Sequence, residues 1–323
     1  MIDNYLVTGA NGFIGSLVVD SLLQQGKNVF ALVRNNSNLK WLKDKNIQLI
    51  YGSLDNLENV KPILDKINYV IHAAGIVQAK NKKEFYKINV IGTINLCKLF
   101  KNSQLKKFIY ISSLTAAGPS SSIQPKLEDE RSNPITDYGI SKIEAESIVA
   151  SSSFDYLILR PGAVFGIRDK AMYSVFKMAS KGIFVKTGRK EKFVSMIDGP
   201  QLANLIVYSA TSVVKKQIIN CAFQEPISLD KFNKLLKEIF KKNIITLRVP
   251  DLMLKFVGFL NETFSKFLGI TPVFDRDKAK DISQIYWVGS TLKLKNKLCW
   301  EPKYNFEEAV GQTIDWYKKN NWL

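Results

Sequence analysis

The chain has 323 residues and a formal net charge of +17, and this length suits one doubly wound domain with a smaller second lobe. No apolar run reaches the roughly 18 residues that a membrane-spanning helix needs. His72 is the only histidine, which excludes a His-based metal site and a Ser-His-Asp triad, and we expect no bound metal. The basic residues are mostly lysines spread along the whole chain, a pattern typical of a solvated surface rather than of nucleic-acid binding.

The location of the protein is predicted from its cysteines and its first residues. Cys97, Cys221 and Cys299 are widely separated and odd in number, so we expect reduced, buried thiols. The first apolar run starts within a few residues of Met1, which leaves no room for a signal peptide. Both features predict a cytoplasmic protein.

A glycine-rich turn follows the first predicted strand. The strand is Asn4–Thr8, the glycines are Gly9, Gly12 and Gly15, and a helical pattern covers Phe13–Gln25. The glycines allow a sharp turn, a close approach of a phosphate and tight packing of the helix on the strand, while the helix N-terminus attracts the phosphate. A plain βα turn is the alternative interpretation, but the strand before it and the helix after it favour dinucleotide binding.

The first half of the chain continues to alternate strands and helices. The further predicted strands are Asn28–Val33, Ile47–Tyr51, Tyr69–His72, Lys107–Ser112 and Tyr156–Arg160, and the helices between them include Asn56–Lys66, Lys82–Lys101 and Asn133–Ser151. This alternation predicts an α/β fold with a doubly wound, Rossmann-type parallel sheet covered by helices on both faces.

The pattern becomes irregular after Pro161. The later predicted elements are the helix Gln201–Ser209, the strand Ile218–Ala222, the helix Leu229–Lys241 and the strand Ile244–Val249. We expect residues 1–163 to form the dinucleotide-binding domain, with a strand near 218–222 returning to it. Residues 164–323 are expected to form most of a smaller substrate lobe.

The segment Asp251–Gly269 is unusually apolar and aromatic. Its apolar positions cover much of a helix circumference. The first interpretation is a helix packed inside the second lobe, and the alternative is contact with a membrane surface or a hydrophobic substrate.

The end of the second strand predicts the type of cofactor. An acidic side chain here would bind the ribose hydroxyls of NAD, whereas an arginine pairs with the 2′-phosphate of NADP. The turn from Leu32 to Ser37 contains Arg34 and no acid. We therefore prefer NADP to NAD, with a merely solvated Arg34 as the alternative.

Three residues predict proton-transfer chemistry. Tyr138 and Lys142 lie four apart, on one face of the predicted helix, where an ammonium can lower the pKa of the phenol. Ser113 follows the fifth strand and can hold a substrate oxygen against the phenolate. Tyr173 and Lys177 share the same spacing, but Tyr138 precedes a core strand and so belongs to the carboxyl edge of the sheet. Tyr173 is predicted to pack inside the lobe.

Several ordered motifs carry a family resemblance. They are TGANGFIG at Thr8–Gly15, HAAG at His72–Gly75, NVIGTINL at Asn89–Leu96, YISS at Tyr110–Ser113, YGISK at Tyr138–Lys142, LRPGAVFG at Leu159–Gly166 and the tail from Trp300. As a set they resemble the extended short-chain dehydrogenase/reductases, in particular the NAD-dependent epimerase/dehydratase subgroup. Some features are similar to the 3β-hydroxysteroid dehydrogenase and dihydroflavonol reductase groups.

The resemblance implies a role for each matching residue. Tyr138 would be the general acid/base, Lys142 would bind the nicotinamide ribose, and Ser113 would polarise the reacting oxygen. Asn89 would brace the sheet, and His72 is expected to be structural. The implied cofactor contacts are Gly9, Asn11, Gly12, Phe13, Ile14, Gly15, Arg34, Ser53, Leu54, Ala73, Ala74, Gly75, Tyr138, Lys142, Pro161 and Val164.

The chain departs from the family pattern at two positions. Ser53 stands where the family often has an aspartate that contacts adenine, so adenine recognition there is expected to use backbone. Phe165 stands where many members have a tyrosine, which removes a hydroxyl near the cofactor.

The resulting prediction is hydride transfer at a secondary alcohol or ketone. We favour a dehydrogenase or reductase of lipophilic substrates, with Thr115 among its substrate contacts. A nucleotide-sugar epimerase is the alternative, in which Arg168, Arg189 and Lys192 would bind the substrate diphosphate. A non-catalytic NADP-sensing protein is the third hypothesis, and the resemblance suggests a homodimer through paired helices.

Overall fold

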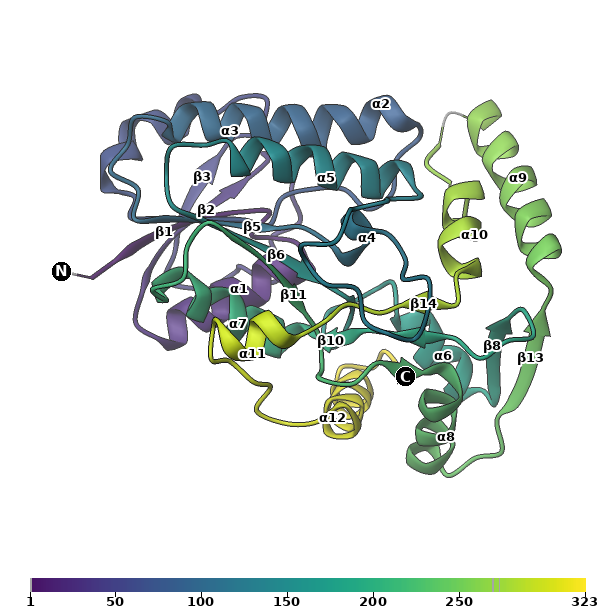
Figure 1. Cartoon of the computed structure of the whole chain (residues 1–323). Coiled ribbons are helices and arrows are strands. Elements are labelled where there is room, and N and C mark those ends of the chain that lie inside the picture. Colours follow the sequence, from purple (N-terminus) through teal and green to yellow (C-terminus); the bar gives the residue numbers. More distant parts are fainter. Residues whose placement is uncertain (1, 269, 273) are drawn as a thin grey trace.

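The computed structural model describes residues 2–268, 270–272 and 274–323. Its centre is a seven-stranded sheet in the order β11-β6-β5-β4-β1-β2-β3 (Figure 1), and all six strand pairs are parallel. The strands are β1 Asn4–Thr8, β2 Asn28–Val33, β3 Gln48–Tyr51, β4 Tyr69–His72, β5 Lys107–Ile111, β6 Tyr156–Pro161 and β11 Gln217–Cys221. The predicted α/β class is confirmed.

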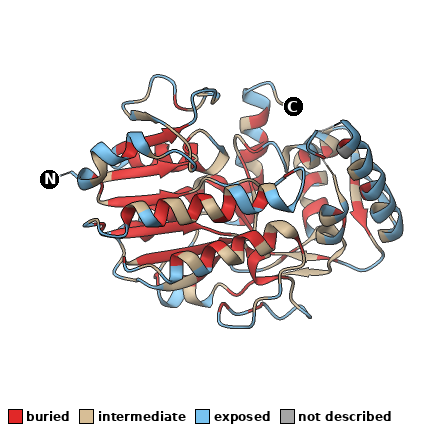
Figure 2. Cartoon of the chain, turned by 90° about the horizontal axis from the view of Figure 1, so that it is seen from above, coloured by how far each residue is buried: buried red, intermediate tan, exposed pale blue. Residues whose placement is uncertain are grey.

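Helices cover both faces of this sheet. On one face lie α1 (Phe13–Gln24) and α7 (Gly199–Thr211). On the other lie α3 (Gly92–Phe100) and α5 (Asp137–Ala150). Strand side chains alternate between the two cores, and Figure 2 shows the strands buried between the helical layers.

The sheet changes direction of winding at β1, which lies between β2 and β4. In open parallel sheets, ligands bind beyond the carboxyl ends of the strands at such a point. The ends of β1, β4, β5 and β6 all lie on this edge.

A third core forms the smaller lobe. It is rich in phenylalanine, with Phe165, Phe176, Phe232 and Phe306 among its buried members. The lobe elements are β7 Ala163–Phe165, α6 Tyr173–Ser180, β8 Ile183–Thr187, β9 Phe193–Val194, β10 Met196–Asp198, β12 Ile227–Ser228, α8 Leu229–Phe240, β13 Ile245–Val249, α9 Asp251–Leu268, α10 Arg276–Ser283, β14 Tyr286–Trp287 and α12 Phe306–Lys319.

The chain after residue 163 contributes both to the core of the lobe and to the core on the α1 side of the sheet. β11 pairs with β6, as the predicted returning strand requires. Side chains of α7, and Leu294 and Leu298 in and after α11 (Leu292–Asn296), join the core beside α1. A division at residue 163 into two domains stays a prediction.

The largest differences from the predicted elements have local causes. The expected helix Asn56–Lys66 is a 3-10 helix, η1 (Glu58–Lys66), because in an α-helix the ring of Pro62 would clash with the carbonyl four residues earlier. The expected helix Lys82–Lys101 is divided into α2 (Lys82–Phe85), the π-helical η2 (Tyr86–Ile91) and α3. The short helix α4 (Leu114–Ala117) and strand β8 were not predicted.

Two further expectations concern exposure and membranes. Cys97 and Cys221 are buried as expected, but Cys299 is exposed, so the prediction of three buried thiols is wrong. No helix in the described ranges is long and apolar enough to cross a bilayer.

Candidate active site

The glycine turn closes tightly on the end of β4. Gly9 has a φ of +67°, and a Cβ there would lie 2.8 Å from the Cα of Ala74. A Cβ on Gly15 would lie 2.1 Å from the Gly9 carbonyl oxygen. Gly12 is the N-cap of α1, and no side chain caps that end of the helix. The first turn of α1 therefore has backbone N–H groups that no side chain caps, which is the arrangement that binds phosphate groups at helix N-termini.

A buried hydrogen-bond chain supports the end of β4. His72 contacts the Thr8 hydroxyl through Nδ1 (2.7 Å) and the Thr93 hydroxyl through Nε2 (3.0 Å). The Thr8 hydroxyl also accepts from the backbone N–H of Ala74 (3.2 Å). Burial lowers the pKa of His72 to about 3, so the ring stays neutral and fixes the backbone at Ala73–Gly75.

Asn89 connects β4 to α5. Its Oδ1 accepts from the Ile76 N–H (2.8 Å), and its Nδ2 donates to the Ile76 carbonyl (3.1 Å) and to the Ser141 hydroxyl (2.9 Å). The Ser141 hydroxyl in turn donates to the Tyr138 carbonyl (2.7 Å). Asn89 therefore links the strand end to the first turn of α5, and Ser141 is a participant that sequence reasoning missed.

Tyr138 and Ser113 meet where two helices begin. Ser113 is the N-cap of α4, and Thr136 caps α5 two residues before Tyr138. A Cβ on Gly139 would lie 2.5 Å from the Thr115 carbonyl oxygen, so this glycine lets α5 approach α4 closely. The Ser113 hydroxyl lies close enough to the Tyr138 phenol to lower its pKa.

Burial controls the protonation of Tyr138. It raises the pKa of the phenol to about 12, and the nearby Ser113 hydroxyl only partly opposes this. The pKa of Tyr138 thus lies above its ordinary value, so the lowering expected from Lys142 is not found. Tyr138 is a neutral phenol at pH 7.

Lys142 lies one helical turn after Tyr138 and contacts the end of β5. Its Nζ donates to the Ile111 carbonyl (2.7 Å) and lies 4.5 Å from the centre of the Tyr110 ring. Burial lowers the pKa of Lys142 to about 7. A Cβ on Gly75 would lie 3.9 Å from this Nζ, so the ammonium adjoins the end of β4 as well.

A buried ion pair fixes α5 to β6. Glu146, one turn after Lys142, accepts from Arg160 Nε (2.8 Å) and Nη2 (2.6 Å), and both side chains are 2% exposed. The Ser112 hydroxyl also donates to Glu146. This pair holds the helix that carries Tyr138 and Lys142. It was not predicted, although a glutamate four residues after Lys142 was visible.

The remaining predicted cofactor residues lie around this edge. Pro161 ends β6, and Val164 lies half-buried in β7. Arg34 is exposed in the turn after β2, where Asn11 Nδ2 reaches the Asn38 carbonyl (3.5 Å).

The other positions of interest contact groups within the chain. The Ser53 hydroxyl accepts from the Asn56 N–H (3.1 Å), and the side chain of Leu54 packs against Gly92. Phe165 is fully buried in the aromatic core of the lobe, where a phenyl ring needs no hydrogen-bond partner. Tyr173 packs in the same core, as expected.

Two of the three cations predicted to bind a substrate diphosphate have partners within the chain. Arg168 pairs with Asp20 of α1 (2.6 Å) and lies over the Trp41 ring. Lys192 is buried and donates to Thr187 Oγ1 (2.6 Å) and the Ile282 carbonyl. Arg189 stays exposed between β8 and β9. Arg168 and Lys192 would have to leave these partners to bind a substrate diphosphate, and their assignment as substrate contacts stays a prediction.

Thr115 lies beside Ser113. Its hydroxyl donates to the Ser113 hydroxyl (2.8 Å). The side chain is half-buried, so Thr115 orients Ser113 from the first turn of α4.

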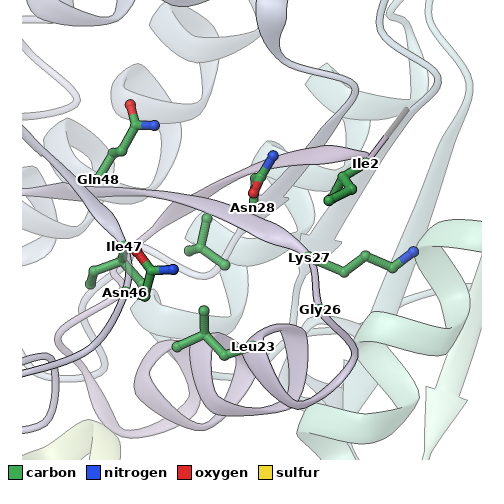
Figure 3. Close-up of a pocket in the computed structure, with 9 residues that line it drawn as sticks. Ile2, Leu23, Gly26, Lys27, Asn28, Asn46, Ile47 and Gln48 are labelled. Atoms are coloured by element: carbon green, nitrogen blue, oxygen red, sulfur yellow. The ribbon is translucent and has the colours of Figure 1, made fainter.

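A surface hollow of about 420 Å³ lies at the opposite, amino edge of the sheet (Figure 3). Its lining includes Leu23 at the end of α1, Asn28 at the start of β2 and Gln48 at the start of β3. None of the predicted site residues lines it. The hollow is therefore separate from the candidate active site.

Comparison with known proteins agrees with this geometry. Residues 5–196 match the NAD dependent epimerase/dehydratase family. UDP-glucose 4-epimerase from Vibrio cholerae is 28% identical over 99% of this chain and 97% of its own. Ceramide reductase from Caulobacter vibrioides is 23% identical over 98% of this chain and 95% of its own.

A solved structure shares the fold. UDP-glucose 4-epimerase from Thermotoga maritima superimposes with a TM-score of 0.78 at 23% identity, covering 98% of this chain and 99% of that one. With the family match extending over more than half of the residues, the chain belongs to the NAD-dependent epimerase/dehydratase family of extended short-chain dehydrogenase/reductases, and it is a nicotinamide-dependent enzyme.

Proposed function

We propose that the protein is an NADP-dependent reductase that converts a ketone of a lipophilic substrate to a secondary alcohol. The observation that carries the proposal is the position of the Tyr138 phenol beside Ser113 at the carboxyl edge of the sheet. A phenol that is protonated at pH 7 can give its proton to the alkoxide that forms at a reduced carbonyl, because the alkoxide is the stronger base. This state suits carbonyl reduction.

Each residue has a distinct role in this proposal. A reduced nicotinamide dinucleotide, when bound, supplies the hydride that the carbonyl carbon accepts. Tyr138 gives its phenolic proton to the carbonyl oxygen, which becomes the hydroxyl of the product. Ser113 holds that oxygen by a hydrogen bond, and Lys142 would bind the nicotinamide ribose. The phenolate regains its proton from solvent.

The glycine turn fits the diphosphate of such a cofactor. Positions 9 and 15 have no space for a Cβ, and the N-terminus of α1 has no side-chain cap. Arg34 supports NADP because it is exposed at the end of β2, where the turn offers no carboxylate. NAD is the alternative cofactor, and relatives solved with NAD support it.

A nucleotide-sugar epimerase is the second candidate, favoured by the 28% identity to UDP-glucose 4-epimerase. Two observations favour reduction instead. Arg168 and Lys192 are engaged within the chain, and the residues after Ser113 form the largely apolar helix α4. The ceramide reductase relative supports a lipophilic substrate. We also propose a cytoplasmic homodimer.

Nucleotide binding tests the cofactor assignment. The purified protein is examined by mass spectrometry for retained nucleotide, then titrated with NADPH and NADH by fluorescence. We expect an empty site that prefers NADPH. The Arg34→Ala variant should lose about tenfold to a hundredfold in NADPH affinity, as for a lost charged hydrogen bond, and little in NADH affinity.

Lys98→Ala, an exposed change on α3, is the matched control and should leave both affinities unchanged. Tightly retained NAD would contradict the reductase and favour the epimerase. Binding of NADPH without turnover of any ketone or sugar would instead favour the sensing protein.

A further inference from the structure

The outer face of α9 exposes an unusual number of large apolar side chains. The helix lies at the end of the molecule, outside α10 (Figure 1). Phe267 is 88% exposed and Leu252 is 80% exposed. The exposed apolar residues include Leu252, Phe256, Phe259, Leu260, Phe264 and Phe267. Patches of this kind usually mark a contact with a partner or a membrane.

The opposite face of α9 explains why these side chains point outward. A Cβ on Gly258 would lie 2.7 Å from the Asp275 carbonyl oxygen. Asn261 Nδ2 donates to the Phe274 carbonyl (2.7 Å), and Ser265 is buried. These small or polar residues lie on one side of the helix at intervals of three and four. Turning the aromatic side inward would break their contacts.

Positive charge surrounds the first half of the exposed face. The exposed bases are Arg189, Lys190, Arg248 and Lys255. Gly188 packs against Asp251, so the loop with the first two bases adjoins the start of α9. None of the four forms an ion pair with any residue that the structure describes. Glu191 is an exposed acid in the same loop.

We propose that α9 is a docking face for an anionic bilayer surface. An apolar helix face bordered by bases suits insertion between acyl chains with the bases at the headgroups. The described helices include none that could span the bilayer, so α9 would lie in the interface. A second copy is a poorer occupant of this face, since the same four exposed bases would then border both sides of the contact.

The face adjoins the end of the molecule that holds the candidate active site. The backbone N–H of Asp137 donates to the Asp277 carboxylate of α10 (2.6 Å). Lys280 of α10 donates to the Ile135 carbonyl (3.2 Å). The pair α9–α10 is thus joined to the start of α5, beside Tyr138. A bilayer docked there would supply a lipophilic substrate. This consequence rests on the proposed function, whereas the docking of α9 is independent of it.

Cosedimentation of the full chain tests the docking. The vesicles contain equal parts of phosphatidylcholine and phosphatidylglycerol, or phosphatidylcholine alone. We expect binding to the anionic vesicles that weakens with salt. Phe256→Ser with Phe267→Ser should reduce it about tenfold or more, and Lys190→Gln with Arg248→Gln should reduce it about fivefold for each base.

Two matched controls should bind as wild type does. Val213→Ser with Leu292→Ser removes exposed apolar groups elsewhere, and Lys43→Gln with Lys98→Gln removes exposed charges elsewhere. Circular dichroism checks that the serine variant is folded, and the charge variant gives an independent test.

The proposal is overturned if the protein ignores anionic vesicles, binds both vesicles equally in any salt, or loses binding equally in the controls. It is also overturned if light scattering without lipid shows a dimer that the serine variant disrupts, because a second copy then covers α9. Turnover of a water-soluble ketone should be unchanged in the serine variant, so failure of docking and failure of the chemistry are distinguishable.

Discussion

The carboxyl edge of the sheet buries charged side chains, whereas the outer face of α9 exposes apolar ones. At the sheet edge Lys142, Glu146 and Arg160 are 5%, 2% and 2% exposed, and each has partners within the chain. On α9, phenylalanine side chains are exposed and the polar Asn261 faces inward. Burying charge is costly unless it is paired, and exposing aromatic surface is costly unless something covers it. The first region is explained by chemistry at the edge, whereas the second calls for a partner outside the chain.

The largest expected effect concerns the phenol at the sheet edge. Tyr138→Phe should reduce turnover about 10²- to 10⁴-fold, because the proton donor is lost, while nucleotide affinity stays near wild type. Tyr173→Phe is the matched control, since it shares the spacing to a lysine but packs in the lobe. Steady-state rates of both variants check this, and equal losses in the two would contradict the assignment.

At the carboxyl edge, the features that depend on residues close together in the sequence could be predicted. The glycine turn, the strand ends and the pairing of Tyr138 with Lys142 by helical spacing were visible in short segments. The partner of Arg168 was not, because Asp20 lies 148 residues earlier. The orientation of α9 was not visible either, because an apolar helix pattern does not reveal whether its apolar side meets a core or solvent.

The next effect concerns the buried ion pair. Arg160→Met should lower the free energy of unfolding by about 3–5 kcal/mol, because Glu146 would be left buried without its partner. Urea unfolding at neutral pH measures this change. The double variant with Glu146→Leu should recover much of the loss, and a double variant as unstable as the single one would show that the charge is not the cause.

A smaller effect compares two glycines with similar backbones. Gly9 and Gly26 have φ values of +67° and +66°, but only at Gly9 does a Cβ meet backbone, whereas at Gly26 it meets open space. Gly26→Ala should cost about 1 kcal/mol from backbone strain alone. Gly9→Ala should cost more and abolish nucleotide binding. Thermal unfolding and NADPH titration measure both, and equal behaviour would argue against a tight turn at Gly9.

The last effect is a pH dependence at Lys142. Burial lowers its folded-state pKa from 10.5 to about 7, so between these values the unfolded chain binds the extra proton. Stability contributed by this group therefore rises with pH in that window, by up to about 1.4 kcal/mol per unit. Relative to Lys142→Met, the wild type should gain stability between about pH 8 and pH 9. A constant difference in urea unfolding would show that Lys142 keeps its charge in the fold.

The most direct test of the central claim follows the cofactor and two kinds of substrate together. The purified protein with NADPH is given a panel of lipophilic ketones, and in a separate assay UDP-glucose. NADPH should be consumed in equal amount with a ketone, through Tyr138, and UDP-glucose should remain unchanged. Interconversion of UDP-sugars with no net change in the cofactor would contradict the central claim.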